Sequence, residues 1–164
     1  MEMSSYIDHT LLDPEATKEA VEALCKEAIT YGFATVCVHP YWVPFAKEIL
    51  ETSSVGITSV IGFPLGMTTK KVKAMETLDC IEKGATEIDM VINIGALKSK
   101  QYEEVEDDIR EVVEAAKGKT VKVIIETGTL TEEEKVKACE LSMSAGATFV
   151  KTSTGFGKGQ GTSK

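Results

Sequence analysis

The sequence alternates between segments typical of β-strands and segments typical of α-helices along most of its length. Strands are predicted near residues 6–11, 34–40, 57–64, 87–94, 120–127 and 148–154. Helices are predicted between them, at residues 13–32, 42–51, 68–84, 102–117 and 131–146. Strict alternation of this kind predicts a parallel sheet with helices packed outside it, because each helix carries the chain back to start the next parallel strand.

Two of the predicted helices carry recognisable signals at their N-termini. Asp13 followed by Pro14 suits an N-cap with proline at the first helical position. Thr131 is followed by a run of glutamates that ends at Glu134, which is the spacing of a capping box. We therefore expect helices to begin at these two places.

Within the strands, apolar and polar residues tend to alternate. In residues 87–94, Ile88, Met90 and Ile92 alternate with acidic and amide side chains. The strands of an open, doubly wound sheet usually read as continuous apolar runs instead. One apolar face and one polar face predict a TIM (β/α)₈-barrel type of α/β fold, with helices on the apolar face. The sequence accounts for about six of the eight βα units.

Three reactive side chains occupy the same position in their segments. In each case a glycine ends a helix and the reactive side chain follows five positions later, at Cys37, Asp89 and Lys151. Because each interior layer of a barrel is built from alternate strands, we expect these three in one layer. Lys122 and Glu126 are expected in the neighbouring layers. The alternative is that they are paired core groups or surface residues, although buried ionisable groups often mark a functional site.

A lysine on a barrel strand suits attack on a carbonyl group to form a Schiff base. The attacking form is the neutral amine, so the pKa of Lys151 must fall from about 10.4 to near 7. Partial burial and a nearby cation lower the pKa of a lysine, and Lys122 is the only other lysine expected to point inward. An ionised Asp89 would oppose that change, so its expected role is proton transfer, directly or through water. Cys37 is most simply a small apolar residue.

Composition and charge exclude several other classes of protein. The net charge of −8 and the pI near 4.9 argue against nucleic-acid binding. No apolar run approaches the roughly 20 residues of a membrane span, and the N-terminus lacks the regions of a signal peptide, so a cytoplasmic protein is expected. Four cysteines without a C-x-x-C pair, together with two histidines, predict neither a zinc site nor a disulfide framework.

The residues around Lys151 and Asp89 closely resemble those of the deoxyribose-phosphate aldolase family, which are cofactor-free class I aldolases on a TIM barrel. The most specific segments are F-V-K-T-S-T-G-F-G and E-I-D-M-V-I-N. The resemblance extends in order through I-D-H-T-L-L, A-T-V-C-V-H-P, S-V-I-G-F-P-L-G and K-V-I-I-E-T. It covers nearly all of the chain from Tyr6 to Gly157.

The resemblance implies a lyase that cleaves 2-deoxyribose 5-phosphate reversibly to acetaldehyde and glyceraldehyde 3-phosphate, with no cofactor and no metal. Lys151 corresponds to the lysine that forms the Schiff base, and Asp89 to the aspartate that assists proton transfer. Lys122 matches an inward polar position and is included with them as catalytic. The resemblance also implies four substrate-binding residues, Asp8, Cys37, Thr154 and Gly155.

The resemblance also implies that a family member continues for two further βα units, with a second lysine and phosphate-binding loops. We therefore expect residues 1–157 to form a partial barrel domain of a C-terminally truncated member, and residues 158–164 to form a Gly-rich tail. Three origins of that tail stay open: a vector scar, an aberrant end or a spliced remnant. Unpaired sheet edges promote association, so a homo-oligomer is expected. The alternatives left open are a non-catalytic fragment or scaffold of the same fold, and a Schiff-base barrel enzyme for another carbonyl substrate.

Overall fold

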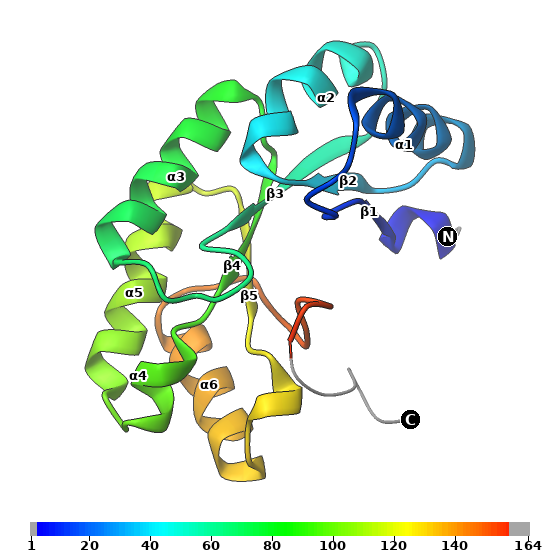
Figure 1. The fold of residues 1–164 in the computed structure, drawn as a ribbon. Helices are drawn as coiled ribbons and strands as arrows, with labels where there is room; N and C mark the ends of the chain where they lie inside the picture. The colour runs from blue at the N-terminus through cyan, green and yellow to red at the C-terminus, as the bar shows by residue number, and fades with distance from the viewer. Residues whose placement is uncertain (1–2, 158–164) are drawn as a thin grey trace. The chain divides into compact units, whose positions relative to one another are not determined.

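The computed structural model describes residues 3–157, and these alternate between strands and helices as the sequence predicts (Figure 1). The strands are β1 Asp8–Thr10, β2 Thr35–Val38, β3 Gly56–Ile61, β4 Glu87–Val91, β5 Thr120–Ile124 and β6 Phe149–Lys151. The α-helices are α1 Lys18–Tyr31, α2 Val43–Leu50, α3 Lys70–Lys83, α4 Ile94–Lys98, α5 Tyr102–Ala115 and α6 Glu132–Ser144. The Gly-rich tail expected at residues 158–164 lies outside the described residues.

The strands form one sheet in which the hydrogen-bonded order follows the sequence, from β1 to β6. Pairing is parallel, with Asp8 opposite Thr35 at the start of β1 and β2, and Lys122 opposite Phe149 in β5 and β6. Sequential parallel strands separated by helices are the βα repeat that the alternating pattern predicts. No helix of the described residues is long and apolar enough to cross a membrane.

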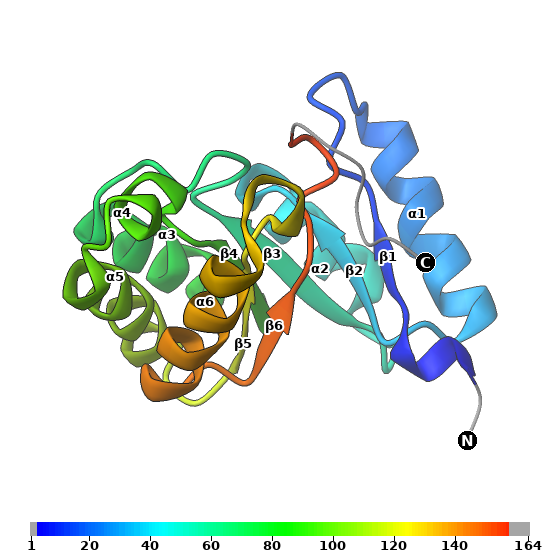
Figure 2. The same ribbon diagram turned by 90° about the horizontal axis from the view of Figure 1, so that it is seen from below.

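The chain divides into two compact units. The first comprises Met1–Val60 and Asp79–Glu87, and the second comprises Ile61–Leu78 and Ile88–Lys164. In the first unit, α1 buries one face, formed by Val21, Leu24, Cys25 and Ala28. In the second unit, β5 and β6 lie side by side and α6 lies next to α5 (Figure 2). The expectation of one domain over residues 1–157 stays a prediction.

The first helix begins later than the sequence signals predict. Asp13 and Pro14 form a turn, in which the Asp13 carboxylate accepts a hydrogen bond from the Glu15 N–H at 2.8 Å. Helix α1 instead starts after Thr17, whose hydroxyl accepts a hydrogen bond from the Ala20 N–H at 3.3 Å. Both residues are good N-caps, and the Asp13 side chain satisfies a local turn instead. The start predicted at Asp13 is therefore wrong.

In the second unit one predicted helix start is confirmed and one helix was not predicted. The Thr131 hydroxyl accepts from the Glu134 N–H at 3.2 Å, and the Glu134 carboxylate accepts from the Thr131 N–H at 2.8 Å, which completes the capping box. Helix α4, which was not predicted, has only five residues and is capped at its N-terminus by Asn93. The expected strand 87–94 therefore ends at Val91, and its last residues turn into this helix.

The helix layer of the second unit contains a buried ion pair that sequence analysis did not predict. Lys73 of α3 has no exposed surface, and its Nζ lies 2.5 Å from Asp108 Oδ2 of α5 and donates to the Val91 carbonyl at 3.0 Å. Burial lowers the pKa of the Lys73 ammonium and raises the pKa of the Asp108 carboxyl, while their mutual attraction acts in the opposite direction. Lys73 lies on a helix, so this pair does not bear on the expectation that Lys122 is the other inward lysine of the strands.

This pair gives a prediction about stability. Lys73→Met should lower the free energy of unfolding by about 3–5 kcal/mol, because it leaves Asp108 as a buried charge without its cation. The double variant Lys73→Met with Asp108→Leu should recover most of that loss, since two apolar side chains leave no buried charge without a partner. Urea unfolding of the two single variants and the double variant measures the coupling.

The matched control is Lys83→Met, which removes the cation of an exposed pair with Asp79 on the same helix. This variant should change stability little, because exposed pairs are screened by solvent. A double variant no more stable than Lys73→Met alone would contradict the account of the pair.

Candidate active site

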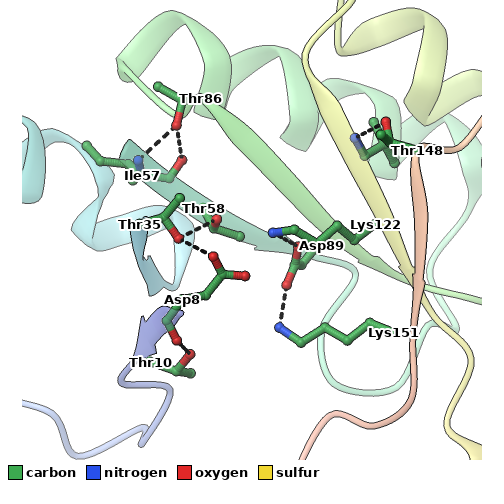
Figure 3. Close-up of polar contacts among 11 residues, drawn as sticks. Asp8, Thr10, Thr35, Ile57, Thr58, Thr86, Asp89, Lys122, Thr148 and Lys151 are labelled. Atoms are coloured by element: carbon green, nitrogen blue, oxygen red, sulfur yellow. Dashed lines mark hydrogen bonds and ion pairs between the residues drawn. The ribbon is translucent and has the colours of Figure 1, made fainter. Parts of the chain in front are cut away.

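Three charged side chains from three adjacent strands of the second unit meet at one point (Figure 3). Asp89 of β4 accepts from Lys151 of β6 at 2.6 Å, through Oδ2. Its other oxygen, Oδ1, accepts from Lys122 of β5 at 3.1 Å. The structure therefore brings together the three residues predicted to be catalytic.

Strand geometry explains why the two lysines reach the same carboxylate. Lys122 lies opposite Phe149 in the parallel ladder, and Ile124 lies opposite Lys151. Successive side chains of a strand point to opposite faces, so residues two apart share a face. Lys122 and Lys151 therefore project from the same face of the sheet. Along the strand direction they are offset by two residues. Asp89 projects between them.

The three side chains differ in exposure in a way that separates their roles. The Asp89 side chain is fully buried, that of Lys122 is 14% exposed, and that of Lys151 is 33% exposed. A buried carboxylate is stable only when cations or hydrogen-bond donors compensate it, and here two ammonium groups do so. Lys151 is the member of the cluster that solvent and a carbonyl compound reach most easily.

The arrangement can perform proton transfer next to a nucleophile. An amine and a carboxylate separated by 2.6 Å are within the distance over which a general base takes a proton. The alternative prediction was that these residues are paired groups of the core. It agrees with the structure in one respect, since both lysines are paired with Asp89. Pairing accounts for the burial of Asp89, whereas the partial exposure of Lys151 is what a reactive amine requires.

Asp8 and Cys37, which are expected to bind substrate, belong to the first unit. Asp8 Oδ1 accepts from the Thr35 hydroxyl at 2.8 Å, and Thr35 in turn lies 2.9 Å from the Thr58 hydroxyl (Figure 3). Cys37 is fully buried on β2. The hydroxyl chain that orients Asp8 was not predicted. The substrate contacts of Asp8 and Cys37 stay predictions.

Thr154 and Gly155, also expected to bind substrate, follow directly after β6. Thr154 is buried, and its hydroxyl donates to the Glu126 carboxylate at 2.5 Å. Gly155 has φ of +83°, in the left-handed region that side chains disfavour, and a Cβ there would meet open space. This segment therefore turns sharply just beyond Lys151.

The structure corrects the expected position of Glu126. The strand predicted over residues 120–127 ends at Ile124, and Glu126 lies beyond it with φ of +56°. Its side chain is nearly buried and contacts Thr154. Nothing in the spacing of these two residues along the sequence signals that they meet.

Within the part of the chain that the structure describes, no three His, Cys, Asp or Glu side chains are grouped so that they could hold a metal ion. The cluster at Asp89 offers two ammonium groups and one carboxylate, which is a poor set of ligands for a cation. Absence of a cofactor stays an expectation from the resemblance.

Comparisons with known proteins give one family for nearly the whole chain. Residues 3–164 match the family described as DeoC/LacD family aldolase. The chain is 60% identical to the deoxyribose-phosphate aldolase of Streptococcus sanguinis over 162 residues, covering 99% of this chain and 74% of that protein. It is 61% identical to the one of Enterococcus faecalis, covering 97% and 73% respectively.

Solved structures agree with the sequence relatives. A crystal structure from Coccidioides immitis matches with a TM-score of 0.96 and 46% identity, over 98% of this chain and 63% of that one. The tetrameric deoxyribose phosphate aldolase of Aeropyrum pernix matches with a TM-score of 0.87 and 39% identity, over 93% and 64%. The chain thus spans about three quarters of the curated relatives and just under two thirds of these solved chains.

The fold and the resemblance predicted from the sequence are both confirmed by these matches. The described residues contain six parallel strands with helices between them, about six βα units of the β/α-barrel type. The matched region includes every residue of the Asp89 cluster and the segment that follows Lys151. This chain belongs to the DeoC/LacD family of aldolases.

Proposed function

We propose that this chain is a lyase that cleaves 2-deoxy-D-ribose 5-phosphate to acetaldehyde and D-glyceraldehyde 3-phosphate, through a Schiff base on Lys151. The observation that carries the proposal is the 2.6 Å contact between Lys151 Nζ and Asp89 Oδ2. It pairs a partly exposed amine with a buried proton acceptor. The curated relatives named deoxyribose-phosphate aldolase support the choice of substrate.

The first steps form the Schiff base. Asp89 accepts a proton from the Lys151 ammonium, and the neutral amine attacks the C1 aldehyde of the open-chain sugar. Asp89 returns that proton to the hydroxyl of the resulting carbinolamine, which leaves as water to give a protonated imine and an ionised Asp89. This cation is an electron sink for the next step, because it draws the electrons of the C2–C3 bond toward nitrogen.

The carbon–carbon bond then breaks. The C3 hydroxyl gives its proton to Asp89, directly or through a water molecule, while the C2–C3 bond electrons form an enamine. Carbon 3 becomes the aldehyde of glyceraldehyde 3-phosphate and leaves. A proton returned to C2 regenerates the imine, and hydrolysis releases acetaldehyde and the free Lys151 amine.

Lys122 has a positioning role in this scheme. Its ammonium occupies Asp89 Oδ1 at 3.1 Å, which leaves Oδ2 directed at Lys151. A carboxylate held through one oxygen cannot rotate away from the reacting amine. Lys122 also compensates the Asp89 charge at each stage in which the carboxylate is ionised.

The remaining substrate contacts are proposed from the family likeness. Thr154 and Gly155 lie beside the sugar phosphate, and Asp8 and Cys37 contact the sugar. The phosphate makes the substrate an anion confined to the aqueous phase, in keeping with a cytoplasmic enzyme. No observation favours the non-catalytic scaffold or a different carbonyl substrate.

We also propose that the protein assembles into a homo-oligomer. The related enzyme from Aeropyrum pernix is described as tetrameric. On β6, Phe149 is 58% exposed and Val150 is 46% exposed. Neighbouring exposed apolar side chains favour contact with another chain.

Trapping with borohydride tests the role of Lys151. Incubation with acetaldehyde followed by reduction should attach an ethyl group to Lys151, and peptide mass spectrometry locates it. Lys122 serves as the internal comparison, because it contacts the same carboxylate but is less exposed. Labelling of other lysines with Lys151 unmodified would contradict the assignment.

Asp89→Asn tests proton transfer. The amide has the same shape as the carboxylate but cannot accept the proton, so retro-aldol kcat/KM should fall by about 10²- to 10⁴-fold. Thermal unfolding is measured beside activity, because the variant also removes the charged partner of both lysines, and activity is compared at temperatures where both proteins are folded. The control is Asp79→Asn, which neutralises an exposed carboxylate in the first unit. Unchanged turnover in Asp89→Asn would rule out this role.

Analytical ultracentrifugation tests the oligomer. The parent chain should sediment as a dimer or larger species at micromolar concentration. Val150→Lys should shift it toward the monomer, because a charged side chain opposes burial of the apolar surface that Phe149 and Val150 expose. Thr152→Lys, at an exposed position just past the strand, is the charge-matched control. A parent that sediments as a single monomer would contradict the proposal.

A further inference from the structure

Glu126 links the end of β5 to the segment that follows β6. Its carboxylate accepts from the Thr154 hydroxyl at 2.5 Å and from the Thr154 N–H at 3.3 and 3.4 Å. Glu126 is 6% exposed and Thr154 is 8% exposed. Hydrogen bonds to a charged, nearly buried acceptor are stronger than those between neutral groups. Both polar donors of Thr154 are therefore held by one side chain.

The backbone of Glu126 is held in an uncommon conformation that directs this side chain. Its φ of +56° lies in the left-handed region, where residues other than glycine are rare. The Thr129 N–H and hydroxyl donate to the Glu126 carbonyl at 3.0 and 2.9 Å. The next residue, Thr127, donates its N–H to the Thr152 carbonyl at 2.8 Å. Local strain kept by several hydrogen bonds is a common feature of functional sites.

The following residues close around the same carboxylate. A Cβ added at Gly157 would lie 2.6 Å from Glu126 Cδ, so the chain passes directly against the side chain. The Phe156 N–H donates to the Thr154 hydroxyl at 3.0 Å, and the Phe156 ring packs edge-on against Phe63 at 5.6 Å. Residues 154–157 are thus folded around Glu126, three residues beyond Lys151.

We propose that Glu126 is a positioning residue that holds residues 154–157 in place to receive the phosphate end of the substrate. The inference rests on the proposed function, which places the sugar phosphate beside Thr154 and Gly155. Because Glu126 takes both donors of Thr154, Thr154 acts by fixing the turn that the left-handed Gly155 continues. Loss of Glu126 therefore weakens recognition of the phosphate more than reaction at C1.

Two variants test the proposal by different routes. Glu126→Gln removes the charge that strengthens the contacts, and Gly157→Ala places a methyl group against an unaltered carboxylate. The controls are Glu133→Gln, at an exposed glutamate, and Gly95→Ala, where a Cβ meets its neighbours at ordinary distances of 3.6 Å or more. Circular dichroism identifies the variants that remain folded. If only one of the two test variants folds, that variant alone is enough to test the proposal.

The first readout needs no activity. Amide hydrogen exchange of Thr154 and Phe156 should accelerate by about tenfold or more in both test variants, while amides of β5 stay protected as in the parent. The second readout is borohydride trapping on Lys151. The half-saturating concentration of 2-deoxyribose 5-phosphate should rise about tenfold, and that of unphosphorylated 2-deoxyribose less than about twofold.

Each other outcome has a distinct meaning. Unchanged exchange at Thr154 in the test variants would show that Glu126 does not hold the segment. An equal rise for both sugars would show that the segment serves the reacting carbon and not the phosphate. Absence of any Lys151 adduct in the parent would refute the proposed function instead, and the exchange data would still decide whether Glu126 positions residues 154–157.

Discussion

The second unit depends on one interaction, the neutralisation of the buried Asp89 carboxylate by two lysines. Asp89 has no exposed surface, so without cations its charge would be unstable inside the sheet. Lys122 and Lys151 come from the next two strands, and the contacts therefore tie β4, β5 and β6 together. The same contacts keep an amine, a proton acceptor and a second cation in fixed positions, which is what Schiff-base chemistry needs.

A second ion pair in the same unit differs from the Asp89 cluster in the exposure of its lysine. Lys73 and Asp108 lie as close together as Lys151 and Asp89, but Lys73 is completely covered. The Lys73 pair therefore joins α3 to α5 and is closed to solvent. Lys151 combines a buried partner with an end that is one third exposed. Partial exposure therefore distinguishes the two amines.

Sequence patterns predicted the parts of the site that strand register controls. Asp89 and Lys151 follow their helix-ending glycines at equal distances, and on alternate strands of a barrel equal spacing places them at one level. The patterns could not reveal Lys73, because a lysine in the charged K-K-V-K run reads as a surface residue and its partner lies 35 positions away. They could not reveal the Glu126 contact either, since it depends on a left-handed turn at a residue other than glycine.

Deuterium exchange into acetaldehyde tests the central claim, that Lys151 and Asp89 together form and reprotonate an enamine. This exchange involves only the two-carbon product, so it does not depend on phosphate binding. In D₂O the protein should exchange the methyl protons of acetaldehyde faster than buffer alone, as followed by proton NMR. Lys151→Met should reduce the rate to that of buffer. Exchange that continues unchanged in Lys151→Met, or a parent protein no faster than buffer, would contradict the account.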